Sequence, residues 1–133
     1  MDQEAFLQPH SEDAASGENL EYDPVFTELE LAAQPGEERQ MGDEVLSAEE
    51  PDYRDIRERA LDVLGRSHDM RAAVLLGMAG LRLTGFPAFA EATTYIRRCL
   101  EDYWETCHPQ LDEDDGDPTM RVNAVLALTD ADA

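Results

Sequence analysis

The chain has 133 residues, and 42% of them are apolar, which is enough for one hydrophobic core but not for two. Its formal net charge is −21, from 31 acidic residues against 10 basic ones. This charge excludes nucleic acid and anionic membrane surfaces as expected partners, because both require basic patches. The partner surface is expected to be neutral or basic.

The most apolar stretch, residues 72–83, is too short to span a bilayer, so direct membrane insertion is not expected. The N-terminus is acidic, whereas a secretory signal begins with basic residues. Two cysteines do not indicate a disulfide framework. Together these features predict a cytoplasmic protein with reduced thiols.

The first part of the chain is the more acidic one and is typical of loop structure. Residues 1–16 are predicted to form a flexible segment. A short helix is then predicted to begin with Asp23 as its N-cap and Pro24 at its first position, and to end at Gln34. Residues 37–50 form a long polar connection without strand-type alternation. A loop of this length is either functional or mobile, and the polar segment from Gln34 to Glu50 is the candidate for an adaptable contact.

Helical periodicity continues through most of the remaining chain. Residues 51–64 carry apolar side chains on one face and charged side chains on the others. Residues 70–83, which follow Asp69 as a predicted N-cap, are apolar nearly all round, as in the central helix of a bundle. Gly77 and Gly80 lower the helix propensity of this segment, so we expect another helix to cross closely there.

A further helix of about 20 residues is predicted to begin at Phe86 and to carry an apolar seam as far as Cys107. His108 is expected to stop it, because a residue that precedes proline is disfavoured in helical geometry. A last helix is predicted to begin at Pro118. Its expected core residues are Val122, Val125 and Leu126.

These segments predict an all-α fold: a compact antiparallel helical bundle of about five helices with an irregular N-terminal segment. The helical domain is expected to span residues 17–128. Residues 129–133 are expected to form a C-terminal tail at a truncation point before further domains.

Cys99 and Cys107 are eight residues apart on the predicted helix, roughly 12 Å at 1.5 Å per residue. This separation is too long for a disulfide or for one shared zinc ion, so both are predicted to be buried thiols. No nucleophile motif accompanies His68 or His108. The sequence therefore predicts no catalytic residue, no metal site, no cofactor and no enzymatic activity.

The acidic run at residues 112–117 lacks the carboxylates that a calcium-binding loop needs at its first and last positions. A solvated loop in which Asp117 caps the next helix is the favoured interpretation, and a weak surface cation site is the alternative.

Trp104 is the only tryptophan, and two interpretations remain open for it: a core side chain, or a hot spot for a partner. It lies four residues before His108, so the two are expected to share a helical face. Arg71 and Arg121 each lie at the start of a predicted helix, where the helix dipole disfavours a cation. Each is therefore expected to reach a carboxylate.

Four ordered segments carry a resemblance to a known family. The most specific is Tyr103–Leu111 (YWETCHPQL) together with Asp117–Ala124 (DPTMRVNA). The others are Gly17–Phe26 (GENLEYDPVF), Ala48–Ile56 (AEEPDYRDI) and Arg66–Arg71 (RSHDMR). This pattern resembles the ImpA N-terminal domain family, found in TssA proteins of the type VI secretion system. The departures are conservative in character, with Asn19, Tyr53, His68 and Met70 where the family pattern has Asp, Trp, Lys and Leu.

The resemblance implies a non-enzymatic assembly component of the bacterial type VI secretion system, a docking domain that contacts baseplate, sheath or tube proteins. It also implies that full-length relatives form rings through C-terminal domains, so that this fragment would be a monomer or a weak dimer. The alternative function is an acidic module that mimics a polyanion and binds a basic protein. The family-motif residues expected to be structural or partner-binding are Tyr22, Asp23, Pro24, Glu50, Pro51, Asp69, Arg71, Tyr103, Trp104, His108, Pro109, Arg121 and Asn123.

Overall fold

The structure, a computed structural model, describes residues 3–10, 14–34, 39–41, 44–46, 52–112 and 114–129. Within these ranges the fold is helical, as predicted. The elements in chain order are α1 (Gln3–Phe6), α2 (Pro24–Ala33), β1 (Arg39–Met41), β2 (Glu44–Leu46), α3 (Tyr53–Leu64), α4 (Met70–Leu83), α5 (Phe86–Asp102), α6 (Thr119–Leu126) and the 3₁₀ helix η1 (Ala127–Thr129).

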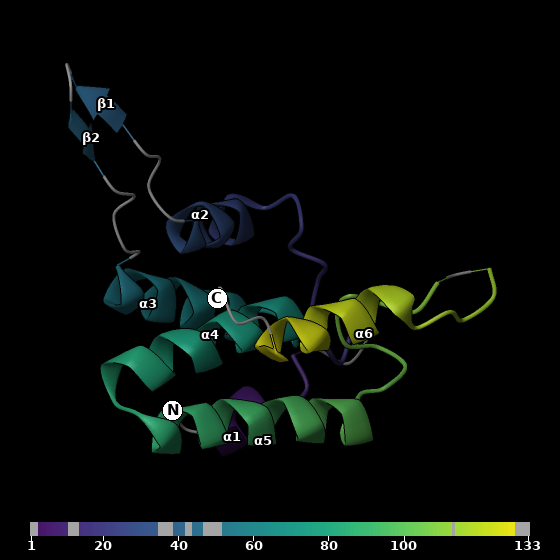
Figure 1. The fold of residues 1–133 in the computed structure, drawn as a ribbon. Coiled ribbons are helices and arrows are strands. Elements are labelled where there is room, and N and C mark those ends of the chain that lie inside the picture. The colour runs from purple at the N-terminus through teal and green to yellow at the C-terminus, as the bar shows by residue number, and fades with distance from the viewer. Residues whose placement is uncertain are drawn as a thin grey trace.

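The helices α2, α3, α4 and α5 lie side by side in a stack, and α6 packs across α4 (Figure 1). Helix α4 is central, since it contacts α3, α5 and α6. Its residues Ala72, Ala73, Val74 and Ala79 are buried, as its continuous apolar sequence predicts. The hydrophobic core therefore lies around α4.

Glycine lets α5 approach α4 closely. A Cβ atom added at Gly80 would lie 2.9 Å from the Cβ of Ala88, and one added at Gly77 would lie 3.1 Å from the Cβ of Ala92. A carbon pair in ordinary contact is separated by about 3.5 to 4.0 Å. The expectation of a closely crossing helix at these two glycines is confirmed.

Aspartate side chains fix the first turns of three helices. The carboxylate of Asp23 accepts a hydrogen bond from the backbone N–H of Val25, and Asp52 and Asp69 accept from the residues two positions later in the same way. Each bond satisfies a backbone donor that has no partner inside the helix. The predicted caps at Asp23 and Asp69 are therefore confirmed, and α4 spans the predicted residues.

The end of α5 differs from the prediction. The helix ends at Asp102, where the N–H of Tyr103 bonds to the carbonyl of Cys99, and not at His108. Residues 103–109 form turns, so Cys107 does not lie on the same helix as Cys99, and Trp104 and His108 do not share a helical face. Both cysteines are free and buried, as predicted.

Three short elements, a helix and two strands, were not predicted. The helix α1 is a single turn inside an otherwise irregular N-terminal segment, and Leu7 behind it belongs to the core. The strands β1 and β2 pair antiparallel, with Arg39 opposite Leu46, within the long polar connection between α2 and α3. Because these strands are three residues each, the sequence offers no period long enough to predict them.

Candidate functional site

Main-chain hydrogen bonds bring three of the motif segments together at one end of the bundle. The N–H of His68 donates to the carbonyl of Ser16 over 2.7 Å, and the N–H of His108 donates to the carbonyl of His68 over 2.8 Å. The N–H of Met70 donates in turn to the carbonyl of His108 over 2.7 Å. Backbone hydrogen bonds therefore join the segment before α2, the start of α4 and the loop after α5.

Gly17 is required at this junction. Its φ angle is 77°, a left-handed conformation that other residues rarely adopt. A Cβ atom there would lie 2.0 Å from the carbonyl oxygen of Arg66. The backbone approach is possible only without a side chain, which explains the glycine at the head of this motif segment.

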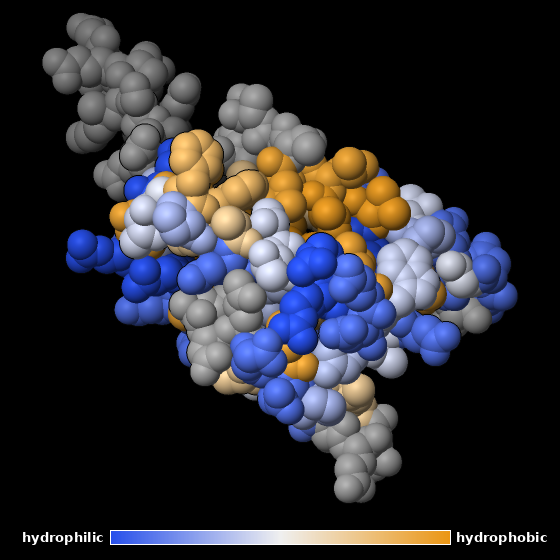
Figure 2. All heavy atoms as spheres, turned by 90° about the horizontal axis from the view of Figure 1, so that it is seen from below, coloured by the Kyte–Doolittle hydropathy of each residue, from blue (hydrophilic) through white to orange (hydrophobic). Residues whose placement is uncertain are grey.

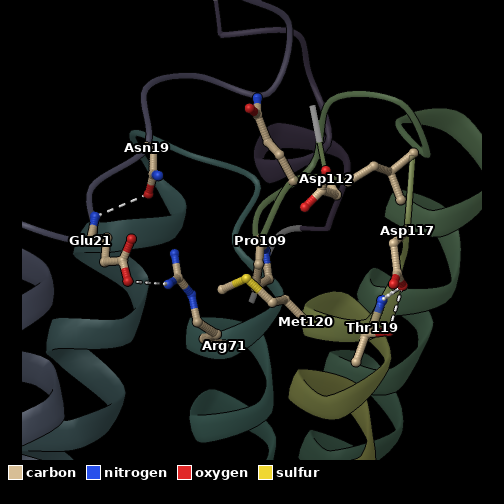
Figure 3. Close-up of a pocket in the computed structure, with 10 residues that line it drawn as sticks. Asn19, Glu21, Arg71, Pro109, Asp112, Asp117, Thr119 and Met120 are labelled. Atoms are coloured by element: carbon tan, nitrogen blue, oxygen red, sulfur yellow. Dashed lines mark hydrogen bonds and ion pairs between the residues drawn. The ribbon is translucent and has the colours of Figure 1, made fainter. Parts of the chain in front are cut away.

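A cleft of about 320 Å³ opens beside this junction. Its wall joins residues from three of the four motif segments, including Glu21, Arg71, Pro109 and Met120 (Figure 3). Arg71 and Met120 extend toward its centre from α4 and α6, and Glu21 faces Arg71 (Figure 3). The carboxylate of Asp117 accepts a hydrogen bond from the backbone N–H of Thr119, the first residue of α6, over 2.8 Å, while Pro118 occupies the cap position.

Arg71 meets carboxylates, as predicted. Its guanidinium donates to Asp69 over 2.7 Å and 3.0 Å, and it lies 3.9 Å from Glu21. The guanidinium also lies 4.4 Å from the centroid of the Phe26 ring. Asp69 is fully buried, so a buried carboxylate is paired with a partly buried cation, which offsets the cost of its burial.

For Arg121 the prediction of a carboxylate partner is wrong. Its side chain is 1% exposed, and it donates to the backbone carbonyls of Pro109 (3.0 Å), Cys107 (2.6 Å) and Trp104. These carbonyls lie in the turns after α5, where no helical N–H pairs with them. A guanidinium has five N–H donors, so one side chain serves all three. Arg121 thereby fastens α6 to the end of α5.

Trp104 is neither a core side chain nor a fully exposed one. It is 42% exposed, and the Arg121 guanidinium lies 4.8 Å from the centroid of its ring. A cation held over the ring limits the orientations of the indole. The hot-spot interpretation is compatible with this half-exposed, fixed tryptophan, whereas the fully buried one is wrong.

An apolar surface extends from Trp104 along α6, and Figure 2 shows the apolar side chains gathered there. Val122 is 45% exposed and Leu126 is 54% exposed. The prediction that these two side chains belong to the core is therefore wrong. Between α5 and α6 this surface is hollowed to about 170 Å³. We call this hollow the α5–α6 groove; it is lined by Leu100, Trp104, Arg121, Val122, Val125 and Leu126.

The rings of His10 and His68 are in contact beside the N-terminal segment, and the backbone N–H of His108 donates to the carbonyl of His68. The rings of His10 and His68 lie 4.5 Å apart between centroids, and the His68 ring lies 4.2 Å from that of Tyr103. The Nε2 atom of His68 lies 3.1 Å from the carbonyl oxygens of Phe6 and Gln8, while its Nδ1 atom lies 3.3 Å from Ser16 Oγ. Sequence spacing gave no signal for this cluster, because its members come from three distant segments.

Burial changes the acid–base behaviour of the cluster. Desolvation and the neighbouring His10 lower the pKa of His68 to about 4. Desolvation also lowers the pKa of His10 and of His108. All three rings are therefore neutral near pH 7, and those of His68 and His108 form hydrogen bonds to backbone carbonyls. His108 donates from Nε2 to the carbonyl of Gly17 over 3.0 Å.

The other predicted motif residues divide between structural and exposed positions. Asp23 pairs with Arg66 over 3.1 Å, and Tyr103 donates its hydroxyl to the carbonyl of Leu7 over 2.6 Å. Tyr22 is 91% exposed, and Asn123 is exposed. Pro24 lies at the start of α2, and Pro109 is buried behind His108. Glu50 and Pro51 lie outside the described residues.

Among the described residues, no group of three or more histidine, cysteine or acidic side chains is placed to hold a metal ion. Burial raises the pKa of the Cys99 thiol to about 12, which keeps it protonated and unreactive. The same described part of the chain contains no helix with the length and hydrophobicity to cross a membrane. The exposed features of this end of the molecule are the cleft and the α5–α6 groove.

Comparison with known proteins agrees with the motif pattern. The sequence profile of the family described as ImpA, N-terminal, type VI secretion system matches residues 7–130. The chain is 43% identical over 129 residues to the type VI secretion system component TssA1 of Pseudomonas aeruginosa, an alignment that covers 96% of this chain and 38% of that protein.

A solved structure shares the fold. The N-terminal domain of the TssA component of the type VI secretion system from Burkholderia cenocepacia, which includes the conserved ImpA_N region, superposes with a TM-score of 0.77 at 24% identity. The superposition covers 96% of this chain and 46% of that one. The chain therefore has the same helical fold as that domain. It belongs to the ImpA N-terminal family of the type VI secretion system, and it spans well under half the length of the relative from P. aeruginosa.

Proposed function

We propose that this chain is a non-enzymatic docking domain that binds a baseplate, sheath or tube protein during assembly of the type VI secretion apparatus. The observation that supports the proposal is the exposed apolar surface of α6 beside Trp104. In a chain of net charge −21, a contiguous apolar surface is costly to leave in water and is typical of an interaction site. Tryptophan side chains are frequent hot spots of such sites.

On this proposal the domain acts in the bacterial cytoplasm, in association with the secretion apparatus, without binding nucleic acid or inserting into the membrane. Ring formation belongs to C-terminal domains of longer family members. The isolated chain is then a monomer or a weak dimer, since two copies would each bring a charge of −21.

The high acidity favours a second candidate function, which is mimicry of a polyanion by a domain that sequesters a basic protein. Charge–charge attraction between exposed groups weakens as salt screens it, whereas apolar contact does not. The salt dependence of binding therefore separates the two candidates.

The test measures binding of the purified chain to the purified sheath, tube and baseplate proteins of the bacterium that encodes it, at about 0.1 M and about 0.5 M salt. A basic DNA-binding protein of the same bacterium is the comparison ligand. Binding of a type VI protein that survives the higher salt supports the docking role. Binding of the basic protein alone, lost at the higher salt, would support the polyanion mimic and overturn the docking role.

A further inference from the structure

We propose that the α5–α6 groove receives an amphipathic helix of the partner protein, with apolar side chains along one face and lysine or arginine near its ends. This inference rests on the proposed function, because it names the part of the partner that the docking domain holds. Its evidence is the lining of the groove, the state of its polar groups and the charge around it.

The groove is lined by apolar side chains from two helices. Val122, Val125 and Leu126 come from α6 at the spacing of one helical face, and Leu100 and Trp104 come from the end of α5 and the turn behind it. The hollow of about 170 Å³ between them has room for apolar side chains of a ligand. Because Arg121 fixes the indole of Trp104, the wall is already formed before a ligand binds.

The groove offers no hydrogen bonds to the backbone of a ligand. The accessible lining of the groove is apolar, and the Arg121 guanidinium is engaged with three carbonyls. An extended peptide would leave its own N–H and C=O groups without partners against such a surface. A helix satisfies its backbone internally, so helix-in-groove binding is the mode that fits.

The charge around the groove favours a basic ligand and disfavours a second copy of the chain. Glu101 and Glu105, which follow Leu100 and Trp104 in the sequence, are both exposed. Glu101 is itself paired with Arg97 over 3.5 Å, so Glu105 and the net charge of −21 are what favour a basic ligand. A second copy would bring the same acids and a further charge of −21, whereas lysine or arginine at the ends of a helix would complement them.

The first experiment measures the affinity of the type VI partner for four versions of the chain: unchanged, Val122→Glu, Leu126→Glu and Leu31→Glu. Leu31 is the matched control, because it is a 61% exposed apolar side chain on α2, remote in sequence from the groove. Each groove variant is expected to weaken binding about tenfold or more, since a carboxylate would be buried against the ligand. The control should bind as the unchanged chain does, and thermal unfolding should verify that all four fold.

The second experiment uses Trp104 as a reporter, because it is the only tryptophan of the chain. A ¹⁵N-labelled chain gives one indole N–H resonance, whatever unlabelled ligand is added. Synthetic peptides that tile the bound partner, one set helical and one set with a central proline, are titrated into it. The indole resonance should shift with an apolar, basic-ended helical peptide and stay in place with its proline counterpart.

The outcomes separate this inference from the proposed function. A type VI protein that binds both groove variants as tightly as the unchanged chain would overturn the groove as the docking surface, while the docking role itself would stand. Failure of every sheath, tube and baseplate protein to bind would overturn both. Sedimentation that shows a dimer of the unchanged chain and a monomer of Val122→Glu would assign the groove to a second copy and overturn the helical partner.

Discussion

Helices α4 and α6 share two features at their starts, yet one is buried and the other is exposed. Each has an aspartate before it that accepts a hydrogen bond from a backbone N–H of the first turn, Asp69 for α4 and Asp117 for α6. Each carries an arginine within its first three residues. Yet α4 is buried on nearly all sides, whereas α6 buries only Arg121 fully and leaves apolar side chains in solvent.

Residues that stabilise the fold and residues that are available to a partner lie on different helices. The buried apolar residues of α4 are enclosed by α3, α5 and α6, so they stabilise the fold and cannot contact a partner. The apolar residues of α6 contribute less to the fold and remain available. The two arginines show the same division, because Arg71 faces the cleft while Arg121 holds α6 in place from inside.

The strongest test of this division is one substitution made in both helices. Val74 on α4 is 3% exposed and Val122 on α6 is 45% exposed. Val74→Glu should lower the free energy of unfolding by about 4 kcal/mol, because it buries a charge without a partner. Val122→Glu should change it by less than about 0.5 kcal/mol. Urea denaturation measures both, and equal costs would contradict the division.

The next test removes the buried arginine. Arg121→Met keeps a side chain of similar length but leaves the carbonyls of Trp104, Cys107 and Pro109 without their donor. The expected loss is about 3 kcal/mol, from several unsatisfied buried acceptors. Arg71→Met, which removes the arginine from the first turn of α4, is measured for comparison. Denaturation curves for Arg121→Met that overlay those of the unchanged chain would refute the fastening role.

Lowering the pH is expected to have a smaller effect on stability. It acts through the buried imidazole of His68, which lies two residues before α4 begins. The pKa of His68 is about 4 in the folded chain, below the ordinary value of 6.5. As the pH falls below 6.5, the unfolded chain therefore binds more protons than the folded chain does. The free energy of unfolding should therefore fall by about 2 kcal/mol between about pH 7 and about pH 5. His10 and His108, whose pKa values are also lowered, add to the same trend.

The control for the acid effect is His68→Asn, which has no imidazole to titrate. Its unfolding free energy should depend less on pH in this window than that of the unchanged chain. If both chains lost stability equally between about pH 7 and about pH 5, the buried imidazole would not be the cause.

The smallest effect concerns the crossing of α4 and α5. Gly80→Ala would place a Cβ atom 2.9 Å from that of Ala88, so the helices would have to separate. We expect a loss of about 1 to 2 kcal/mol, since overpacking outweighs the gain in helix propensity. Adding Ala88→Gly should recover part of the loss, and a double-mutant cycle by thermal unfolding measures this coupling.

The family could be predicted from the sequence, but the roles of the motif residues could not. The motif around Trp104 and His108 predicted the family, which the comparison confirmed. The pattern did not distinguish the exposed Tyr22 from the buried Asp69 and Arg121, because motif residues occur at structural and at binding positions alike. The convergence of the three histidines could not be predicted either, since it depends on backbone pairing between distant segments.

The sequence by itself determined the features that depend on neighbours a few residues away. The caps at Asp23 and Asp69, the span of α4 and the need for small residues at its crossing follow from side chains acting within one helical turn or from an uninterrupted apolar segment. Only the tertiary structure decided that α5 ends at Asp102, that Arg121 serves carbonyls rather than a carboxylate, and that α6 keeps an apolar face in solvent. These features depend on contacts between segments far apart in the chain. Local periodicity shows which side chains share a face, but not which faces other segments cover.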